Sequence, residues 1–295
     1  MKSGPVEGDF DALPVAEMAA GPIHSRRMSD FQTAVLGGAG LTVRRMGLSA
    51  SYWPGRQTVH YAVDQGVTVF FCYGFDRQMV TSLRELFRHG RDHFIVITGA
   101  YNLLITHTNI RRTLEKRLRQ LGADYLDFFL LLGVTKPKHF PESVQEELMR
   151  LREEGKVRGI GMSCHDRSFA GKTMAAGAMD TLMMRYNAAH RGAESDIFPH
   201  LAHKPTVISY TATRWGHLLR RPKGYPASEP VPTAPLCYRF VLSSPQVDVV
   251  LTAPSNLAQL KENLTALDGG PLADDEMAFM RRFGDIVHAQ KRWFM

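Results

Sequence analysis

Short runs of apolar, often β-branched residues alternate along the chain with longer amphipathic stretches. Eight of these runs have the length of a buried strand, about four to eight residues. The runs cover residues 46–50, 67–71, 94–98, 125–132, 157–162, 181–185, 206–210 and 247–252. Because helix-length stretches separate them, the pattern predicts parallel strands that alternate with helices.

Several of the intervening stretches carry the periodicity of an amphipathic helix. In residues 108–121, leucine and isoleucine recur at intervals of three or four, with arginine and lysine on the other face. Residues 143–154 repeat this pattern before Gly155, and residues 256–264 begin with the capping residue Asn256. Eight strands and about eight helices predict an α/β fold, a (β/α)8 TIM barrel. A doubly wound sheet is the alternative, but its first strand would be followed by Gly-x-Gly-x-x-Gly, which is missing here.

The first 45 residues do not follow this alternation. Residues 31–45 hold a group of glycines between two apolar segments, which predicts a short hairpin. Residues 1–27 are rich in glycine, proline, alanine and acidic residues without sustained periodicity. We therefore expect an N-terminal extension over 1–27, flexible or packed as an arm, and a single barrel domain over 28–295.

Composition and charge narrow the class of protein and of partner. Hydrophobic residues make up 44 % and charged residues 22 %, as in globular proteins, and no apolar run has the length of a membrane span. The three cysteines form neither a disulfide framework nor a metal-ligand cluster, so we expect a reducing cytoplasm and no metal. The net charge of +7 lies in short clusters without a nucleic-acid-binding motif. We expect a small-molecule substrate as partner, with neither nucleic acid nor membrane; the sequence does not predict the oligomeric state.

Chemistry in such a barrel is expected on the loops that follow the carboxyl ends of the strands. These predicted junctions carry many hydroxyl and aromatic side chains and few carboxylates. Tyr73, Cys72 and His165 are the candidate catalytic residues, because a phenol, a thiol and an imidazole can each transfer protons or attack a substrate. A buried cysteine is also common as simple packing, which is the alternative for Cys72.

Five segments match, in order, the sequence motifs of one known family. QLGADYLDFFLLL at 120–132 is similar to RLGTDYIDLYLLH, and EGKVRGIGMS at 154–163 is similar to EGKIRAIGVS. The segments RYN, VISY and SNLAQLKENL, at 185–187, 207–210 and 255–264, resemble xYN, VIAY and SNPEQLEENL. The family that carries these motifs is the aldo-keto reductases, and the resemblance spans about residues 30–270.

The resemblance implies that NADP(H) binds in extended form across the carboxyl ends of the strands, where the family reduces carbonyl compounds. Ser255, Gln259, Glu262 and Asn263 match the residues that hold the adenosine part of the cofactor. Their place at a helix N-terminus suits a phosphate, which unpaired N–H groups and the helix dipole attract.

Two further residues match positions around the nicotinamide. Tyr210 matches the tyrosine that stacks under its ring, and Ser163 matches one residue that holds its carboxamide. The family often places Lys or Arg near the adenosine phosphate, where this chain has Ala253 and Pro254. NAD(H), or no cofactor at all, therefore stays as an alternative to NADP(H).

The resemblance fails at the family's catalytic residues, which are a tyrosine, a lysine, a histidine and an aspartate. The positions of the aspartate, lysine and histidine hold Cys72, Gly99 and Leu132, and Tyr73 comes about four residues earlier than the family's tyrosine. We expect an NADP(H)-dependent oxidoreductase that acts on a carbonyl or alcohol compound through an atypical active site. The alternatives are a non-redox isomerase, lyase or dehydratase, and a nucleotide-binding pseudoenzyme.

Overall fold

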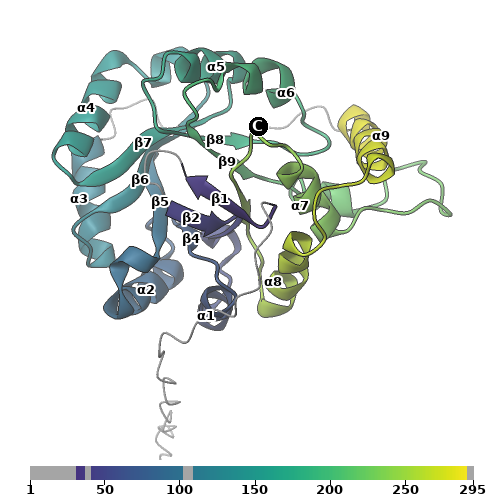
Figure 1. Ribbon diagram of the computed structural model, residues 1–295, viewed down its shortest axis with the longest axis horizontal. Helices are drawn as coiled ribbons and strands as arrows, with labels where there is room; N and C mark the ends of the chain where they lie inside the picture. The colour runs from purple at the N-terminus through teal and green to yellow at the C-terminus, as the bar shows by residue number, and fades with distance from the viewer. Residues whose placement is uncertain (1–30, 37–40, 102–108, 291–295) are drawn as a thin grey trace, which may run out of the picture.

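Eight parallel strands close into a barrel in the computed structural model, which describes residues 31–36, 41–101 and 109–290. The strands follow the order β10-β3-β4-β5-β6-β7-β8-β9: each strand from β3 to β9 pairs with the next along the chain, and β10 pairs with β3 to close the barrel (Figure 1). Their bounds are β3 Met46–Ser49, β4 Val69–Phe71, β5 Ile95–Tyr101, β6 Leu126–Val134, β7 Val157–Cys164, β8 Thr181–Arg185, β9 Thr206–Tyr210 and β10 Val249–Thr252. The predicted (β/α)8 barrel is confirmed.

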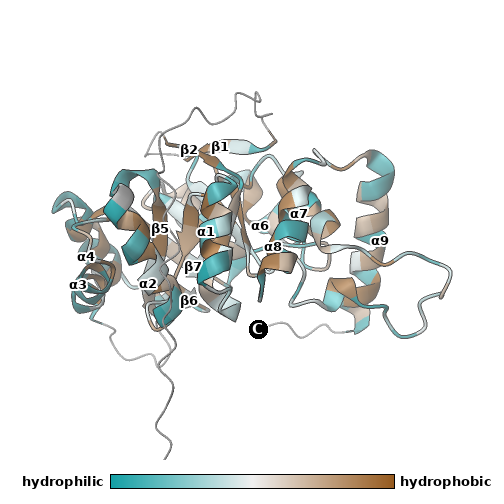
Figure 2. Ribbon diagram, turned by 90° about the horizontal axis from the view of Figure 1, so that it is seen from below, coloured by the Kyte–Doolittle hydropathy of each residue, from teal (hydrophilic) through white to brown (hydrophobic). Residues whose placement is uncertain are grey.

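Helices surround the barrel and present their hydrophobic faces to it (Figure 2). They are α1 Arg56–Asp64, α2 Arg77–Leu86, α3 Ile110–Leu121, α4 Glu142–Glu153, α5 Arg167–Ala175, the short α6 Ala193–Asp196, α7 Ala234–Leu242, α8 Leu257–Leu264 and α9 Asp274–Gln290. Helix α3 begins where the Asn109 side chain accepts a hydrogen bond from the Arg112 N–H group, and it ends at Gly122 in the left-handed conformation. Among the described residues, none of the helices combines the length and apolar character needed to cross a bilayer.

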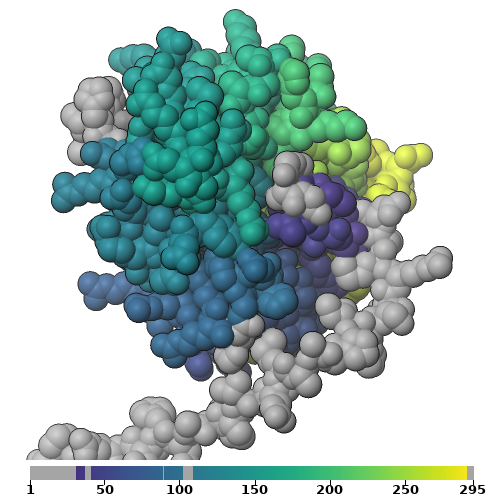
Figure 3. Space-filling model, turned by 60° about the vertical axis from the view of Figure 1, so that its left-hand side comes forward, coloured from purple at the N-terminus to yellow at the C-terminus, as the bar shows by residue number. Residues whose placement is uncertain are grey.

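A hairpin of β1 (Thr33–Leu36) and β2 (Leu41–Arg44) precedes the barrel, as predicted. It covers the end of the barrel where the strands begin, and it lies on the molecular surface there (Figures 2 and 3). Leu36 and Val43 are buried against side chains inside the barrel. The loops that follow the strands lie at the opposite end of the barrel, which we call the barrel mouth. The predicted extension over 1–27 lies outside the described residues.

Two hydrophobic layers hold the fold together, and they decide where each strand residue points. Phe71, Ile97 and Leu132 belong to the layer inside the barrel, whereas Cys72 and Leu131 belong to the layer between barrel and helices. Successive residues of a strand point to opposite faces. Neighbouring residues at one strand end therefore have different access to a ligand at the barrel mouth.

Candidate functional site

Three tyrosines meet where β4, β5 and β9 end. Tyr101 and Tyr210 are the last residues of β5 and β9, and Tyr73 lies just beyond β4; all three pack on the inner layer and are half-buried. The rings of Tyr73 and Tyr101 are stacked, with their centroids 5.7 Å apart. On its other side, Tyr73 stacks with the exposed Phe75 at 5.1 Å. The predicted residues Tyr73 and Tyr210 thus lie close together at the barrel mouth. We call the group formed by Tyr73, Tyr101, Tyr210 and Phe75 the aromatic floor.

The hydroxyl of Tyr73 belongs to a chain of hydrogen bonds. It lies 2.8 Å from Ser51 Oγ, which lies 2.9 Å from Ser49 Oγ. Tyr73 also forms a side-chain hydrogen bond with Tyr101. Burial, followed by the neighbouring Tyr73, raises the pKa of Tyr101, so Tyr101 stays a neutral phenol. The Tyr73 hydroxyl is therefore held in place between a serine pair and a second phenol.

Arg185, the last residue of β8, brings a positive charge to this floor. Its side chain forms a hydrogen bond with Tyr210, and the predicted residue Ser163, which is buried, forms another. Burial raises the pKa of Tyr210, while the positive charge of Arg185 and the two hydrogen bonds oppose that rise. The guanidinium carbon of Arg185 also lies 5.6 Å from the ring centre of Trp215.

His165 follows β7 on the same face, as predicted. Burial, and then the charge of Arg185, lowers the pKa of His165 to about 4. Its imidazole is therefore neutral at pH 7 and does not serve as an acid there. Nδ1 of His165 is buried and has no hydrogen-bond partner among the described residues. No group of three or more His, Cys, Asp or Glu side chains that could hold a metal ion occurs in the described part of the chain.

Cys72, the remaining catalytic candidate, does not join Tyr73 and His165. Its side chain is fully buried in the layer between barrel and helices. Burial, and then the nearby Asp76, raises the pKa of Cys72 to about 12. A buried neutral thiol on the outer side of the strand is typical of packing.

The other two altered catalytic positions lie inside the barrel and are filled by apolar atoms. Leu132 is 2 % exposed and belongs to the inner layer. A Cβ atom added to Gly99 would lie 2.9 Å from Leu132 Cγ and closer still to the Leu130 carbonyl oxygen. The backbone oxygen cannot move without disturbing β6, so a lysine at position 99 does not fit this barrel.

Gly99→Ala is therefore expected to destabilise the protein by about 1–3 kcal/mol through overpacking. The additional substitution Leu132→Ala should not restore stability, because the tighter contact is with the Leu130 carbonyl group. Urea unfolding of both variants measures the effect. An unfolding midpoint of Gly99→Ala equal to that of the unmodified protein would contradict this account of the site.

The residues matched to the adenosine end lie on and just before α8, with Ser255 and Gln259 at its start and Glu262 and Asn263 in its last turn. The Ser255 backbone N–H and hydroxyl both donate to Gln259 Oε1, at 2.8 and 3.0 Å, while Asn256 caps the helix. Ser255, Gln259 and Glu262 are exposed on one surface. Asn263 is instead buried, and its Nδ2 donates to Thr252 Oγ1 at 2.9 Å. The structure thus brings three of the four side chains to the surface, while Asn263 anchors α8 to β10.

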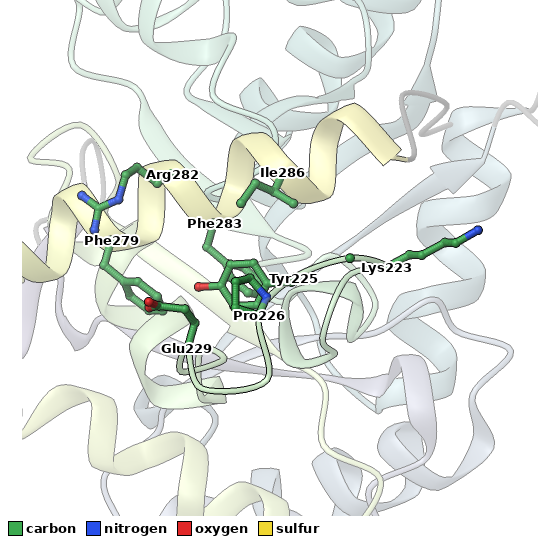
Figure 4. Close-up of a pocket in the computed structure, with 9 residues that line it drawn as sticks. Lys223, Tyr225, Pro226, Glu229, Phe279, Arg282, Phe283 and Ile286 are labelled. Carbon is green, nitrogen blue, oxygen red and sulfur yellow. The ribbon is translucent and has the colours of Figure 1, made fainter.

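A separate pocket of about 430 Å³ lies between α9 and the loop that leads to α7. Tyr225 and Phe283 meet edge to face in it, with ring centres 5.1 Å apart (Figure 4). Lys223 extends away from these rings (Figure 4). Because its labelled polar side chains do not converge on one point, this pocket offers less to a catalytic reaction than the barrel mouth.

Sequence reasoning missed Arg185, Tyr101 and Ser51 as site residues. Arg185 lies in the RYN motif and at the end of the predicted run 181–185. The usable signal was the alternation of the strand: Met183 points into the barrel, so Arg185 does as well. A cation at an inward position of a strand end is a candidate for ligand binding.

Comparison with known proteins agrees with the fold and the motifs. The aldo-keto reductase YhdN of Bacillus subtilis is 27 % identical over 173 residues, which are 52 % of this chain and 50 % of that protein. The NADH-specific methylglyoxal reductase of Escherichia coli is 27 % identical over 93 residues, 31 % of this chain and 28 % of the relative. The chain thus spans about half, or less, of the length of these curated relatives.

Solved structures share the fold. The holo form of aldo-keto reductase AKR11C1 from Bacillus halodurans has a TM-score of 0.71 at 19 % identity, covering 85 % of this chain and 96 % of that one. An aldo-keto reductase from Klebsiella pneumoniae, in complex with NADPH, has a TM-score of 0.71 at 22 % identity, covering 90 % and 99 %. The pattern of the aldo/keto reductase family matches residues 37–229. Since that match includes more than half of the chain, the chain belongs to the aldo/keto reductase family.

Proposed function

We propose that this chain is an NADP(H)-dependent oxidoreductase that reduces a small carbonyl compound with Tyr73 as proton donor. The observation that carries the proposal is the position of the Tyr73 hydroxyl, 2.8 Å from Ser51 Oγ and hydrogen-bonded to Tyr101 at the barrel mouth. The missing lysine and histidine of the family make this site atypical. Membership of the aldo/keto reductase family, and relatives that are named as oxidoreductases, support oxidoreduction as the class of reaction.

The residues present suit a dinucleotide. The start of α8 offers exposed polar side chains from Ser255 and Gln259, and a helix N-terminus favours a phosphate; Glu262 is exposed further along the same helix. At the other end, the half-buried ring of Tyr210 is oriented by Ser163 and Arg185 and offers a face for stacking. Structures of relatives with NADP or NADPH support the same cofactor here.

The chemistry that NADP(H) supplies when bound is a hydride for the carbonyl carbon. Tyr73 then donates its hydroxyl proton to the carbonyl oxygen, which gives the alcohol and a tyrosinate. Ser51, which is partly exposed, is hydrogen-bonded to Tyr73, so a proton can return from solvent to the phenolate through its hydroxyl. His165, neutral because its pKa is about 4, does not compete as the acid at neutral pH.

Fluorescence titration with NADPH and NADH, followed by measurement of NADPH oxidation with a panel of aldehydes and ketones, tests the proposal. We expect binding and cofactor oxidation that depends on the carbonyl compound. Absence of NADPH and NADH binding would overturn it. Turnover that proceeds without added nucleotide would replace it with a non-redox reaction.

Glu262→Ala is expected to weaken NADPH binding about tenfold, because the exposed carboxylate is matched to a hydrogen bond with the adenine amine. Titration of the variant at constant ionic strength measures the change. Glu153→Ala is the matched control, since Glu153 is also exposed near a helix end and lies on α4. Equal loss of affinity in both variants would mean that general charge, rather than the α8 site, determines binding.

A nucleotide-binding protein without turnover is the second candidate. The apolar side chain of Leu132 inside the barrel favours it, because it puts hydrocarbon close to the mouth at the position matched to the family's histidine. NADPH binding without oxidation by any carbonyl compound of the panel would support this candidate. Tyr73→Phe would then leave all measured properties except stability unchanged.

A further inference from the structure

We propose that Asp76 and Arg117 are positioning residues, which hold the turn after β4 so that the hydroxyl of Tyr73 faces the barrel mouth. This inference rests on the proposed function, since it assigns the orientation of the same proton donor. The evidence lies on the outer side of the turn, where two buried side chains of opposite charge meet the peptide groups of Gly74.

The turn that carries Tyr73 is short. Strand β4 ends at Phe71, and residues 72–76 connect it directly to α2. Tyr73 continues the alternation of the strand by packing on the inner layer. The chain turns at Gly74, whose φ of 85° is a conformation that other residues adopt only with strain. The direction of the Tyr73 ring therefore depends on what fixes this glycine.

Side chains from two helices hold the N–H and the carbonyl group of Gly74. The N–H group donates to Asp76 Oδ1 at 2.5 Å, and the carbonyl accepts from Gln120 Nε2 at 3.0 Å. Arg117 Nη1 in turn donates to Gln120 Oε1 at 2.8 Å. Asp76 stands at the start of α2, whereas Arg117 and Gln120 lie on α3. Two elements outside the barrel thus fix the same turn.

The guanidinium of Arg117 also packs directly against the turn. A Cβ atom added to Gly74 would lie 2.0 Å from Arg117 Cζ and Nε, far inside van der Waals contact. Glycine at position 74 therefore permits both the positive φ angle and the close approach of the guanidinium. Because Arg117 comes from α3, it supports the turn from outside the barrel, while the Tyr73 ring packs inside.

Asp76 and Arg117 direct their hydrogen bonds to the turn and to Gln120. Both are buried, with exposed fractions of 2 % and 9 %, and Asp76 Oδ2 and Arg117 Nε have no hydrogen-bond partner among the described residues. Burial raises the pKa of Asp76, while backbone hydrogen bonds and the charge of Arg117 oppose that rise. Buried charges of opposite sign add little net stability compared with hydrocarbon, but they fix one arrangement of the groups around them.

The position of the Tyr73 hydroxyl matters because proton transfer requires hydrogen-bond distance to the carbonyl oxygen. A displacement of about 1 Å can slow such a reaction by about 10²-fold. The Tyr73 ring stacks with Phe75, which is 68 % exposed and belongs to the same turn, so this contact moves with the turn. The contacts at Gly74, which come from other elements, therefore control where the phenol stands.

Single-turnover oxidation of NADPH tests the positioning role, with NADPH affinity measured in parallel. Asp76→Ala should lower the rate at least about tenfold, with equal losses in kcat and kcat/KM and unchanged NADPH affinity, because the Gly74 N–H group loses its acceptor. Asp76→Asn keeps a carbonyl oxygen for that N–H group and should stay within about threefold of the unmodified protein. Gln120→Ala removes the donor to the Gly74 carbonyl and should also slow the reaction, so it decides the question if Asp76→Ala does not fold.

Asp180→Ala is the matched control. The Asp180 carboxylate also accepts from a backbone N–H group, that of Ile160 at 2.9 Å, and pairs with Arg152 at 2.8 Å. It precedes β8, at the end of the barrel away from the mouth, so its removal should change the rate by less than about twofold. Equal slowing of Asp180→Ala, an unchanged rate in folded Asp76→Ala, or an Asp76→Asn variant as slow as Asp76→Ala would each overturn the positioning role.

A spectroscopic measurement separates this inference from the proposed function. Replacing Tyr73 with 3-fluorotyrosine gives a fluorine NMR signal whose shift depends on the stacking with Phe75 and Tyr101. Asp76→Ala should move this signal toward that of free fluorotyrosine, and Asp180→Ala should not. Such a shift without any NADPH oxidation keeps the positioning role and rejects the oxidoreductase. An unmoved signal in Asp76→Ala overturns the positioning role, even if carbonyl reduction is observed.

Discussion

Tyr73→Phe is expected to lower the rate of carbonyl reduction by about 10²–10⁴-fold while the affinity for NADPH stays the same. The substitution removes one oxygen atom and keeps the ring, which stacks with Phe75 and Tyr101 at 5.1 and 5.7 Å. It therefore removes the proton donor and the hydrogen bond to Ser51 without opening the aromatic floor. Stopped-flow measurement of NADPH oxidation under single-turnover conditions isolates the chemical step from product release.

Tyr52→Phe is the matched control for this experiment. Tyr52 lies in the loop after β3 and is 48 % exposed, so its hydroxyl is next to the mouth but faces solvent. We expect its rate to differ from that of the unmodified protein by less than about twofold. A Tyr73→Phe variant with an unchanged single-turnover rate would assign the proton to another group, and Tyr101, hydrogen-bonded to Tyr73, would be the next residue to test.

The sequence predicted all eight barrel strands because their apolar runs are short, regular and separated by helical stretches. Three of them, β5, β6 and β7, are longer than the predicted runs. The run at 94–98 continues to Tyr101, since Gly99, Ala100 and Tyr101 pair with β6 although glycine and alanine do not favour strands. The tertiary pairing, which a local pattern does not contain, decides where such a strand ends.

The site was predictable only in part, for a related reason. The end of a predicted strand shows which residues lie near the barrel mouth. Whether a side chain points into the barrel or toward the helices, however, changes from each residue to the next. Cys72 points to the helices and Phe71 into the barrel, so the thiol is buried away from Tyr73. Tyr73, Ser163, His165 and Tyr210 do reach the mouth. Arg185 lies two residues after Met183, whose side chain is in the inner layer. Because alternate residues of a strand share a face, Arg185 also points into the barrel.

One motif residue that helped to identify the family has a structural role that the sequence did not reveal. Asp127 of β6 is completely buried. Its carboxylate accepts hydrogen bonds from Arg91 Nη2 at 2.7 Å, from the Val96 N–H group at 2.8 Å and from Arg158 Nη1 at 3.1 Å. It thereby joins β6 to β5 and β7 and forms ion pairs with two arginines.

Asp127→Ala is expected to lower the free energy of unfolding by about 3–5 kcal/mol, the cost of removing one partner from a buried ion pair. Arg91 is 14 % exposed in its side chain and would lose the carboxylate that balances its charge. The Val96 N–H group would lose its acceptor. Urea unfolding followed by circular dichroism measures the change, and the same experiment on Asp124→Ala provides the control. Asp124 is exposed and three positions away, so its removal should change the unfolding free energy by less than about 0.5 kcal/mol.

Asp127→Asn separates charge from hydrogen bonding in this network. Asparagine keeps an acceptor for the Val96 N–H group but removes the negative charge from between Arg91 and Arg158. If the ion pairs dominate, Asp127→Asn should lose most of the stability that Asp127→Ala loses. If the acceptor for the backbone dominates, the unfolding free energy of Asp127→Asn should stay close to that of the unmodified protein.

Because Arg158 is 39 % exposed and water can replace part of its partner, we expect the larger share of the loss to come from Arg91. Arg91→Ala in the Asp127→Asn background should therefore recover stability, whereas Arg158→Ala should not.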